Sequence, residues 1–382
     1  MITSQIRAHE PSYGVYVHLP WCRVRCPYCA FNVYPVRDAL WPAYVDALLL
    51  HWQQEAPHFR DAPSSLFFGG GTPSLIPGAL LARLVAGLSA RADAELTLEA
   101  NPEDLVGEDG ESRLASWLDA GINRLSLGVQ TFDARVGRRL GRTRTAEAGR
   151  SALARSRGVQ KRSVDLIFGA PEQTWEALRE DIEIAASEVD HISLYGLTLE
   201  EGTPFGRRPE LRVDDDRWAE LYEGALERLD HHGFERYEVS NFARPGHRCQ
   251  HNEHYWRARP WAGIGAGAHG WRPSGERTVA IAEPVAYIDA VHRSLPLIEA
   301  AVPEPDARLH DLLWTTLRHV EGTPIRWLEA ATGHKLIVPA ALTAGGLLST
   351  ADGSLRLGRH AFLLADGITD RIHAASIGSS GR

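Results

Sequence analysis

Short apolar runs alternate along the first 200 residues with longer segments in which apolar residues recur at helical spacing. The runs have the length of buried strands and are bounded by turn residues, so they predict six strands. These are Gly14–Leu19, Leu66–Gly69, Glu95–Ala100, Arg124–Val129, Ser163–Phe168 and His191–Thr198. The segments between and after them predict helices over Pro42–Trp52, Pro77–Leu88 and Glu111–Ala120, and others that begin after Thr174 and at Asp214.

Strands that alternate with helices form right-handed βαβ units with parallel strands, so the predicted fold class is α/β, with six units in a full or partial barrel. Unusual residues stand where the predicted strands end: the cysteines, the run GGGTP, Glu99 with Asn101, and Gln130. In parallel α/β barrels the active site lies at the C-terminal ends of the strands. A functional site is therefore predicted at that end.

After about residue 235 the pattern changes. Tyr237–Phe242 predicts one more strand, followed by loop-rich sequence that contains HNEHYW (His251–Trp256) and the glycine-rich run Gly263–Gly270. From Pro305 helical spacing returns, and Leu355–Leu357 and Phe362–Leu364 resemble short strands. We predict a partial barrel over residues 1–235, a segment that closes it and contributes to a ligand site over 236–300, and a mostly helical C-terminal domain over 301–382.

Composition narrows the class of protein. The chain has 382 residues, of which 44% are hydrophobic and 24% charged, as in ordinary globular proteins. A net charge of −8 disfavours nonspecific binding to nucleic acid. No stretch of 18 apolar residues is present, so we expect no membrane span and a cytoplasmic location.

Three of the four cysteines crowd together at Cys22, Cys26 and Cys29, and Cys249 stands alone. A disulfide framework needs denser cysteines in a shorter chain. A structural zinc site, as in a zinc-ribbon interaction protein, needs a fourth ligand that the neighbouring sequence lacks. A [4Fe–4S] cluster held by three cysteines would keep one iron open to a cofactor or substrate. Three unligated cysteines are the remaining alternative.

The cysteine pattern CxxxCxxC, with Tyr28 before its last cysteine, resembles the signature of radical S-adenosylmethionine (SAM) enzymes. Further blocks extend the likeness from about residue 13 to 270: FFGGGTPS, LEANPED, RLSLGVQTF, VDLIFGAPEQT, ISLYGLTLEEGTP, YEVSNFARPG and HNEHYW. They resemble the subgroup that contains oxygen-independent coproporphyrinogen III oxidase and the HemW-type haem chaperones. This likeness implies a partial (β/α)6 radical SAM barrel with a [4Fe–4S] cluster and SAM as cofactors.

The resemblance also implies roles for individual residues. Cys22, Cys26 and Cys29 would be the metal ligands. Arg142 would bind the SAM carboxylate, for which a planar guanidinium fork is suited. Glu99 would accept hydrogen bonds from the ammonium or hydroxyl groups of SAM. The full set expected to bind SAM is Tyr16, Tyr28, Gly70, Gly71, Thr72, Glu99, Gln130, Arg142 and Asp165.

Two features favour the haem chaperones within this subgroup. The oxidases carry a further cysteine two residues after the third one, where this chain has Phe31, and they have a longer N-terminal extension. The motif HNxxYW is associated in the family with haem, and a neutral imidazole can ligate haem iron. His251 is the first candidate ligand, ahead of His254, His269 and the thiolate of Cys249. A purely structural histidine remains the alternative.

The predicted function is that of a HemW-like haem chaperone, which binds haem and delivers it to respiratory haem proteins. The resemblance further implies an electron donor such as flavodoxin or ferredoxin, and peripheral membrane association. The alternative is a radical SAM enzyme of the same subgroup, either an anaerobic coproporphyrinogen III dehydrogenase or a two-SAM methyl or alkyl transferase. Whether SAM is cleaved stays open at this point.

Overall fold

The computed structural model describes residues 12–142, 145–293, 295 and 298–378. The N-terminal limit of the predicted barrel domain and the C-terminal limit of the tail therefore lie outside the described residues. The boundaries at 235 and 300 stay predictions.

Within the described residues, twelve strands form one mixed sheet in the order β14-β13-β12-β11-β1-β4-β5-β6-β7-β8-β10-β9. Its centre is a run of parallel neighbours, which confirms the predicted α/β class. These strands are β1 (Gly14–Leu19), β4 (Ser65–Gly70), β5 (Glu95–Ala100), β6 (Arg124–Gln130), β7 (Lys161–Phe168), β8 (His191–Gly196) and β11 (Trp261–Ile264).

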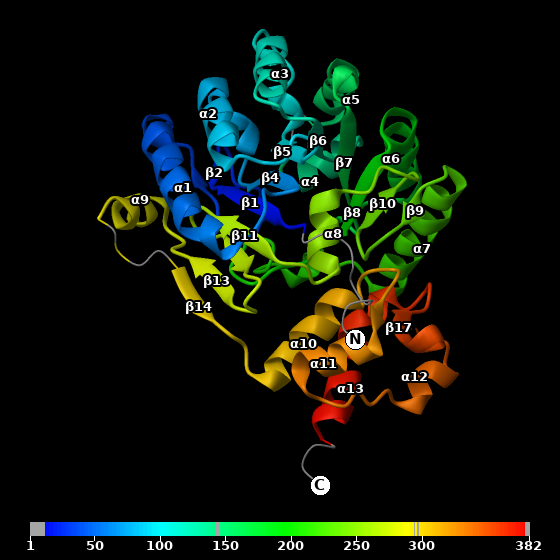
Figure 1. Cartoon of the computed structure of the whole chain (residues 1–382). Coiled ribbons are helices and arrows are strands. Elements are labelled where there is room, and N and C mark those ends of the chain that lie inside the picture. Colours follow the sequence, from blue (N-terminus) through cyan, green and yellow to red (C-terminus); the bar gives the residue numbers. More distant parts are fainter. Residues whose placement is uncertain (1–11, 143–144, 294, 296–297, 379–382) are drawn as a thin grey trace.

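The helices that connect these strands cover the outer side of the curved sheet (Figure 1). Thr174 caps the N-terminus of α6 by accepting a hydrogen bond from Ala177 N, and Asp214 caps α7 in the same way. The helices are α1 (Trp41–Glu55), α2 (Gly78–Leu88), α3 (Gly110–Asp119), α4 (Ala134–Arg139), α5 (Thr145–Arg155), α6 (Trp175–Glu188) and α7 (Asp215–His231).

The segment after α7 extends the sheet at both edges. On the β8 edge, β10 (Asn241–Ala243) pairs antiparallel with β8 and with β9 (Glu235–Arg236). The predicted strand Tyr237–Phe242 is therefore wrong in its bounds, because a turn separates β9 from β10. The Glu238 carboxylate stabilises this turn by accepting a 3.0 Å hydrogen bond from Ser240 N.

On the other edge, the glycine-rich run that seemed to be a loop includes the end of β11 and the start of β12 (His269–Trp271). The chain continues with β13 (Arg277–Ala280), α9 (Pro284–His292) and β14 (Ile298–Ala301). The glycines allow close packing. Gly265 has a φ of 105°, and a Cβ there would approach the His18 carbonyl oxygen to 2.5 Å.

The rest of the chain is mostly helical, as predicted, and forms a separate lobe (Figure 1). Its hydrophobic core contains Leu309, Leu313, Leu328 and Ile372 and is distinct from the core of the barrel. Phe362–Leu364 is a short 3₁₀ helix and not a strand. The elements are α10 (Pro305–Thr316), β15 (Thr323–Pro324), α11 (Ile325–Thr332), α12 (Ala340–Ala344), β16 (Leu348–Ser349), β17 (Ser354–Leu357) and α13 (Ala365–Ile377).

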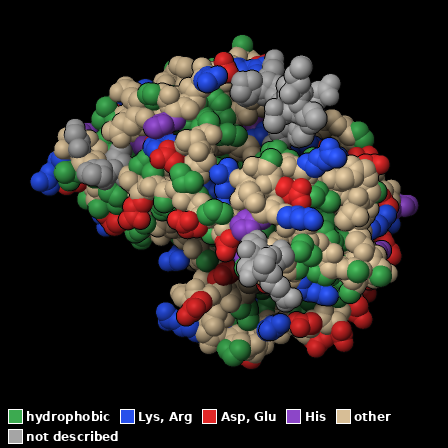
Figure 2. Space-filling model, turned by 60° about the horizontal axis from the view of Figure 1, so that its bottom comes forward, with side chains coloured by type: hydrophobic (Ala, Val, Ile, Leu, Met, Phe, Trp, Pro, Cys, Tyr) green, Lys and Arg blue, Asp and Glu red, His purple; other side chains and the backbone are tan. Residues whose placement is uncertain are grey.

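The surface carries charged side chains of both signs. Figure 2 shows acidic and basic side chains scattered over one face of the molecule. No helix within the described ranges has the length and apolar character needed to cross a membrane.

Candidate cofactor site

The three clustered cysteines lie on the loop that follows β1. Cys22 ends the short strand β2 (Trp21–Cys22), which pairs with β3 (Tyr34–Pro35). Cys29 N donates to the Cys26 carbonyl oxygen at 3.1 Å, and all three side chains are half-buried. Burial raises the pKa of Cys22, and the nearby Cys29 and Cys26 thiols raise it further. Burial also raises the pKa of Cys29, to which the Cys26 thiol adds. The three thiols thus lie half-buried on one loop, although no three such side chains of the described residues are arranged to hold a single metal ion.

These thiols line a cavity of about 480 Å³ at the C-terminal ends of the parallel strands. The cavity is the place predicted from the strand ends, and most of the predicted site residues meet there. Besides the cysteines they are Tyr28, Gly70, Gly71, Thr72, Glu99, Gln130, Arg142 and Asp165. Tyr16 is not among the lining residues. It lies behind the cavity wall, where its hydroxyl is 3.0 Å from His18 Nδ1.

A chain of hydrogen bonds runs across the cavity from the cysteine loop. Thr72 Oγ1 donates to Cys22 Sγ at 3.4 Å and accepts from Asn101 Nδ2 at 3.2 Å. Asn101 Oδ1 in turn accepts from Arg142 Nη1 at 2.7 Å. The guanidinium of Arg142 is thereby fixed relative to a cysteine that stands 120 positions earlier in the sequence.

Two half-buried carboxyl groups, Glu99 and Asp165, line another part of the cavity. Gly70 N donates to Glu99 Oε2 at 3.2 Å, and Ser126 Oγ donates to Asp165 Oδ1 at 3.1 Å. Burial raises the pKa of both carboxyls, and that of Glu99 reaches about 8 because the charge of Asp165 adds to the effect of burial. These two carboxyl groups are suited to a ligand that brings a positive charge and hydroxyl groups.

Backbone conformation shapes the same cavity. Gly70 has a φ of 113°, and a Cβ there would come within 2.6 Å of the His18 ring. Gln130 has a φ of 71°, and the pairing of β6 with β7 shifts register between Leu127 and Gln130. Such an irregularity at a strand end redirects a side chain, which explains how Gln130 reaches the cavity.

Comparisons with known proteins agree with this geometry. A family model described as the radical SAM superfamily matches residues 16–185. The heme chaperone HemW of Escherichia coli (strain K12) is 39% identical over 272 residues, covering 68% of this chain and 70% of that protein. HemW of Bacillus subtilis (strain 168) is 31% identical over 376 residues, covering 92% of this chain and 97% of that protein.

The chain belongs to the HemW family of the radical SAM superfamily.

The fold agrees with this assignment. The solved structure of coproporphyrinogen III oxidase (HemN) from Escherichia coli superposes with a TM-score of 0.79 and covers 96% of this chain and 92% of that one. At 22% sequence identity, the superposition shows that the fold is shared.

The cavity fits the cofactors that the superfamily implies, a [4Fe–4S] cluster and SAM. Three adjacent thiols supply three of the usual four cysteine ligands, and neither a histidine nor a fourth cysteine is found among the described residues that line the cavity. Cys249 is buried near the opposite ends of the strands, where its thiol donates to Glu95 Oε1 at 3.4 Å. The cavity therefore offers the cluster three cysteines and leaves space beside them for SAM.

His251, the predicted haem ligand, lies away from this cavity, at the start of β1 and β4. Its Nδ1 is 2.8 Å from Ser65 Oγ and its Nε2 is 2.7 Å from Tyr255 Oη, and only 1% of the residue is exposed. A Cβ on Gly14 would approach the His251 ring to 2.6 Å, so the histidine packs directly on β1. In this conformation both ring nitrogens are engaged, and the haem-ligand role stays a prediction.

Several cavity residues were missing from the predicted set. Asn101 was noticed at a strand end but given no role, although it links Thr72 to Arg142. Ser126 and Tyr195 also line the cavity, and each lies on a parallel strand, β6 or β8. Their position on the strands was the available signal, because inward-facing polar residues near strand ends belong to the same rim.

The raised pKa of Glu99 predicts a pH-dependent affinity for SAM. Below pH 8 the Glu99 carboxyl is mostly protonated, whereas the proposed contact with the SAM ammonium requires the carboxylate. The affinity should therefore rise with pH between 6.5 and 8, by up to about tenfold per unit. Calorimetric titration with SAM across this range measures the slope. Glu99→Gln should flatten it, and an equal slope in the variant would contradict the role of Glu99.

Proposed function

We propose that this chain is a haem chaperone, which binds haem and delivers it to respiratory haem proteins on a scaffold that holds a [4Fe–4S] cluster and SAM. The supporting observation is the similarity to HemW proteins over most of the chain, together with the identity of residue 31. Phe31 is 67% exposed beside the cysteine loop. It stands at the position where the coproporphyrinogen III oxidases that this sequence resembles carry another cysteine. The chain thus keeps the cofactor cavity without that extra thiol.

The residues of the cavity would divide the work as follows. Cys22, Cys26 and Cys29 would hold the cluster, which when reduced supplies an electron to the bound SAM. Arg142 would hold the SAM carboxylate, and Glu99 would accept a hydrogen bond from the ammonium group. The hydrogen bonds that link Cys22 through Thr72 and Asn101 to Arg142 would fix the SAM-binding guanidinium relative to the cluster.

An electron donor such as flavodoxin or ferredoxin would dock over the cysteine loop. Val24 is 74% exposed on this loop, and together with Phe31 it forms an apolar surface next to the thiols. Arg23 and Arg25 flank it, which suits an acidic partner. Peripheral membrane association remains a prediction for which the described residues offer no specific surface.

The test of the proposal is a haem titration of the purified full chain. A saturable Soret band at stoichiometric haem supports the chaperone, and its absence would overturn the proposal. Anaerobic conversion of coproporphyrinogen III under reducing conditions would instead support the dehydrogenase. Formation of 5′-deoxyadenosine coupled to a methylated or alkylated small molecule would support the transferase.

A second arm of the titration tests His251 without deleting it, because His251→Ala would leave a cavity and unpaired polar groups in the core. Tyr255→Phe removes one hydroxyl and frees His251 Nε2. If His251 ligates the iron, this variant should bind haem more tightly than the parent chain, by about tenfold for one lost hydrogen bond. An unchanged affinity would give His251 a structural role, and the remaining candidates, His254, His269 and Cys249, would then be replaced one at a time to find the residue whose loss removes the Soret band.

A further inference from the structure

The inner face of the barrel holds a buried arginine, Arg124. It is the first residue of β6, and successive side chains of a strand point to opposite faces of the sheet. Leu125 and Leu127 pack in the hydrophobic core of the barrel, whereas Ser126 lines the cysteine cavity. Arg124 shares the face of Ser126 and therefore points into the barrel, where only 2% of the residue is exposed.

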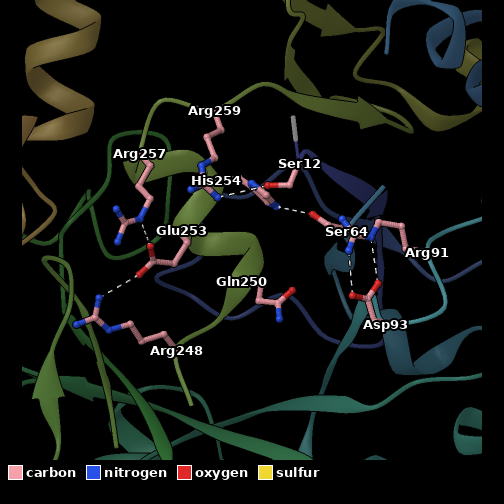
Figure 3. Close-up of a pocket in the computed structure, with 10 residues that line it drawn as sticks. All are labelled: Ser12, Ser64, Arg91, Asp93, Arg248, Gln250, Glu253, His254, Arg257 and Arg259. Atoms are coloured by element: carbon pink, nitrogen blue, oxygen red, sulfur yellow. Dashed lines mark hydrogen bonds and ion pairs between the residues drawn. The ribbon is translucent and has the colours of Figure 1, made fainter. Parts of the chain in front are cut away.

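Arg124 has no ion pair, unlike arginines that lie beside α8 (Gln250–Trp256). Figure 3 shows two of these, Arg248 and Arg257, paired with Glu253 of that helix. No carboxylate of the described chain forms an ion pair with Arg124, and its Nη2 is buried without a hydrogen-bond partner. Its charge is therefore not spent on a direct contact with a carboxylate.

The carboxylate of Glu95, on the neighbouring strand β5, is already engaged. It accepts a hydrogen bond from Lys161 Nζ at 3.0 Å and another from Gln250 N at 2.8 Å. Burial of a cation without an ion pair destabilises a folded protein. A stabilising ion pair therefore does not account for Arg124.

The strand register places Arg124 one step along the inner face from the two carboxyl groups of the cysteine cavity. Arg124 stands opposite Thr97 on β5, and Glu99 is the next residue of β5 on that face. Asp165 on β7 accepts from Ser126, the next inner-face residue of β6. Burial raises the pKa of both carboxyls, and the charge of Arg124 acts on each of them in the opposite direction.

Few other charges act on these two carboxyls. Besides one another, the charged and titratable groups that face them are Arg124, Arg142, Tyr16, Tyr195 and Tyr255. Burial raises the pKa of all three tyrosines, so their hydroxyls stay protonated. Arg142 would be engaged by the SAM carboxylate. Arg124 is not among the described residues that line the cavity, so its charge stays available to the two carboxyls when SAM is bound.

We propose that Arg124 is a positioning residue for SAM binding, whose buried charge favours the ionised form of Glu99 and Asp165 and so lets them accept hydrogen bonds from the cofactor. It would act through its electric field, without touching SAM, because a charge in the protein interior is weakly screened. The proposal rests on the SAM contacts of these two carboxyls, which belong to the proposed function. It adds to that function a residue from outside the cavity.

The test is calorimetric titration of the reconstituted full chain with SAM from pH 6.5 to pH 9.5. In Arg124→Met the two carboxyls lose a nearby cation, so they should ionise at higher pH. The rise of affinity with pH should move upward by about one unit, and the affinity at pH 7 should fall about tenfold. At the upper end of the range the two proteins should bind SAM with nearly equal affinity.

Two further variants separate charge from packing. Arg124→Lys keeps a cation at this position, so its pH profile should lie closer to that of the parent chain. Arg162→Met removes a cation from the outer face of β7, where Arg162 Nη1 donates to the Leu153 carbonyl oxygen at 3.1 Å. This control changes the net charge by the same amount and should leave the profile where it is.

An unshifted profile in Arg124→Met would overturn the proposal, as would an equal shift in Arg162→Met. A loss of affinity that is the same at every pH would give Arg124 a purely structural role. The thermal unfolding midpoint without SAM checks this role separately. Removal of an unpaired buried cation should leave the midpoint equal to or above that of the parent chain, and a marked fall would count against the proposal.

Failure of this proposal is distinguishable from failure of the proposed function. A parent chain whose SAM affinity does not change with pH would remove the role of Glu99, on which Arg124 depends. A slope that Arg124→Met leaves in place would remove Arg124 alone. The haem titration is independent of both results.

Discussion

Cys26→Ser should leave the protein without its iron–sulfur cluster. Anaerobic reconstitution of the parent chain should yield about four iron and four sulfide per chain with a brown chromophore, and the variant should retain almost none. Among the described residues three thiols line the cavity, so the loss of one leaves the cluster with two cysteine ligands. Iron and sulfide analysis together with the visible absorption spectrum measure the effect.

Cys249→Ser is the matched control for this experiment. Cys249 is fully buried, and its thiol donates a hydrogen bond to Glu95 at the ends of the strands opposite the cysteine loop. Its replacement should therefore leave the iron content unchanged. Equal loss of iron in the two variants would mean that Cys249 is a cluster ligand or that both variants misfold. Stoichiometric zinc without a chromophore in the parent chain would end the radical SAM interpretation altogether.

Arg142→Gln should weaken SAM binding by about 10- to 100-fold, the usual range for losing a charge-assisted hydrogen bond to a carboxylate. Arg142→Lys keeps the positive charge but not the planar fork, so it should lie between the parent chain and Arg142→Gln. Both variants also lose the present bond to Asn101 Oδ1. Calorimetric titration of the reconstituted protein with SAM measures the affinities.

Arg139→Gln is the control, because Arg139 is a nearby exposed arginine that pairs with Glu172. It should leave the SAM affinity within about twofold of the parent value, as expected for a surface ion pair. A comparable loss in Arg139→Gln would assign the effect to net charge. Full affinity in Arg142→Gln would remove Arg142 from the site.

The position of the site was predictable because parallel strands end on the same side of a sheet. Once the strand before Cys22 and the strand before Gly70 were recognised, their following loops had to be neighbours. The role of Arg142 was predictable only through the family resemblance, because it belongs to no strand end. Its link through Asn101 depends on two hydrogen bonds between distant segments, which no local pattern reports.

The errors have physical causes. The run Gly263–Gly270 seemed to be a loop because glycine is disfavoured in strands, yet Gly263 packs so closely that a Cβ would meet the His269 carbonyl oxygen at 2.0 Å. The prediction for His251 rested on the motif HNxxYW and stays a prediction, but the burial of this histidine was not visible in the motif. Its neighbours Ser65 and Tyr255 occupy both ring nitrogens, and only Tyr255 is close in sequence.

The placement of β11 has a consequence for how the chain is made. β1 is paired on both edges, with β4 and with β11, but β11 is not complete until residue 264 has been synthesised. At ordinary rates of translation, the second edge of this early strand stays open on the ribosome for roughly 10 to 50 s. During that interval the nascent chain exposes a β-edge that can pair with other polypeptides. A fragment that stops before Trp261 would keep this edge open permanently and should aggregate.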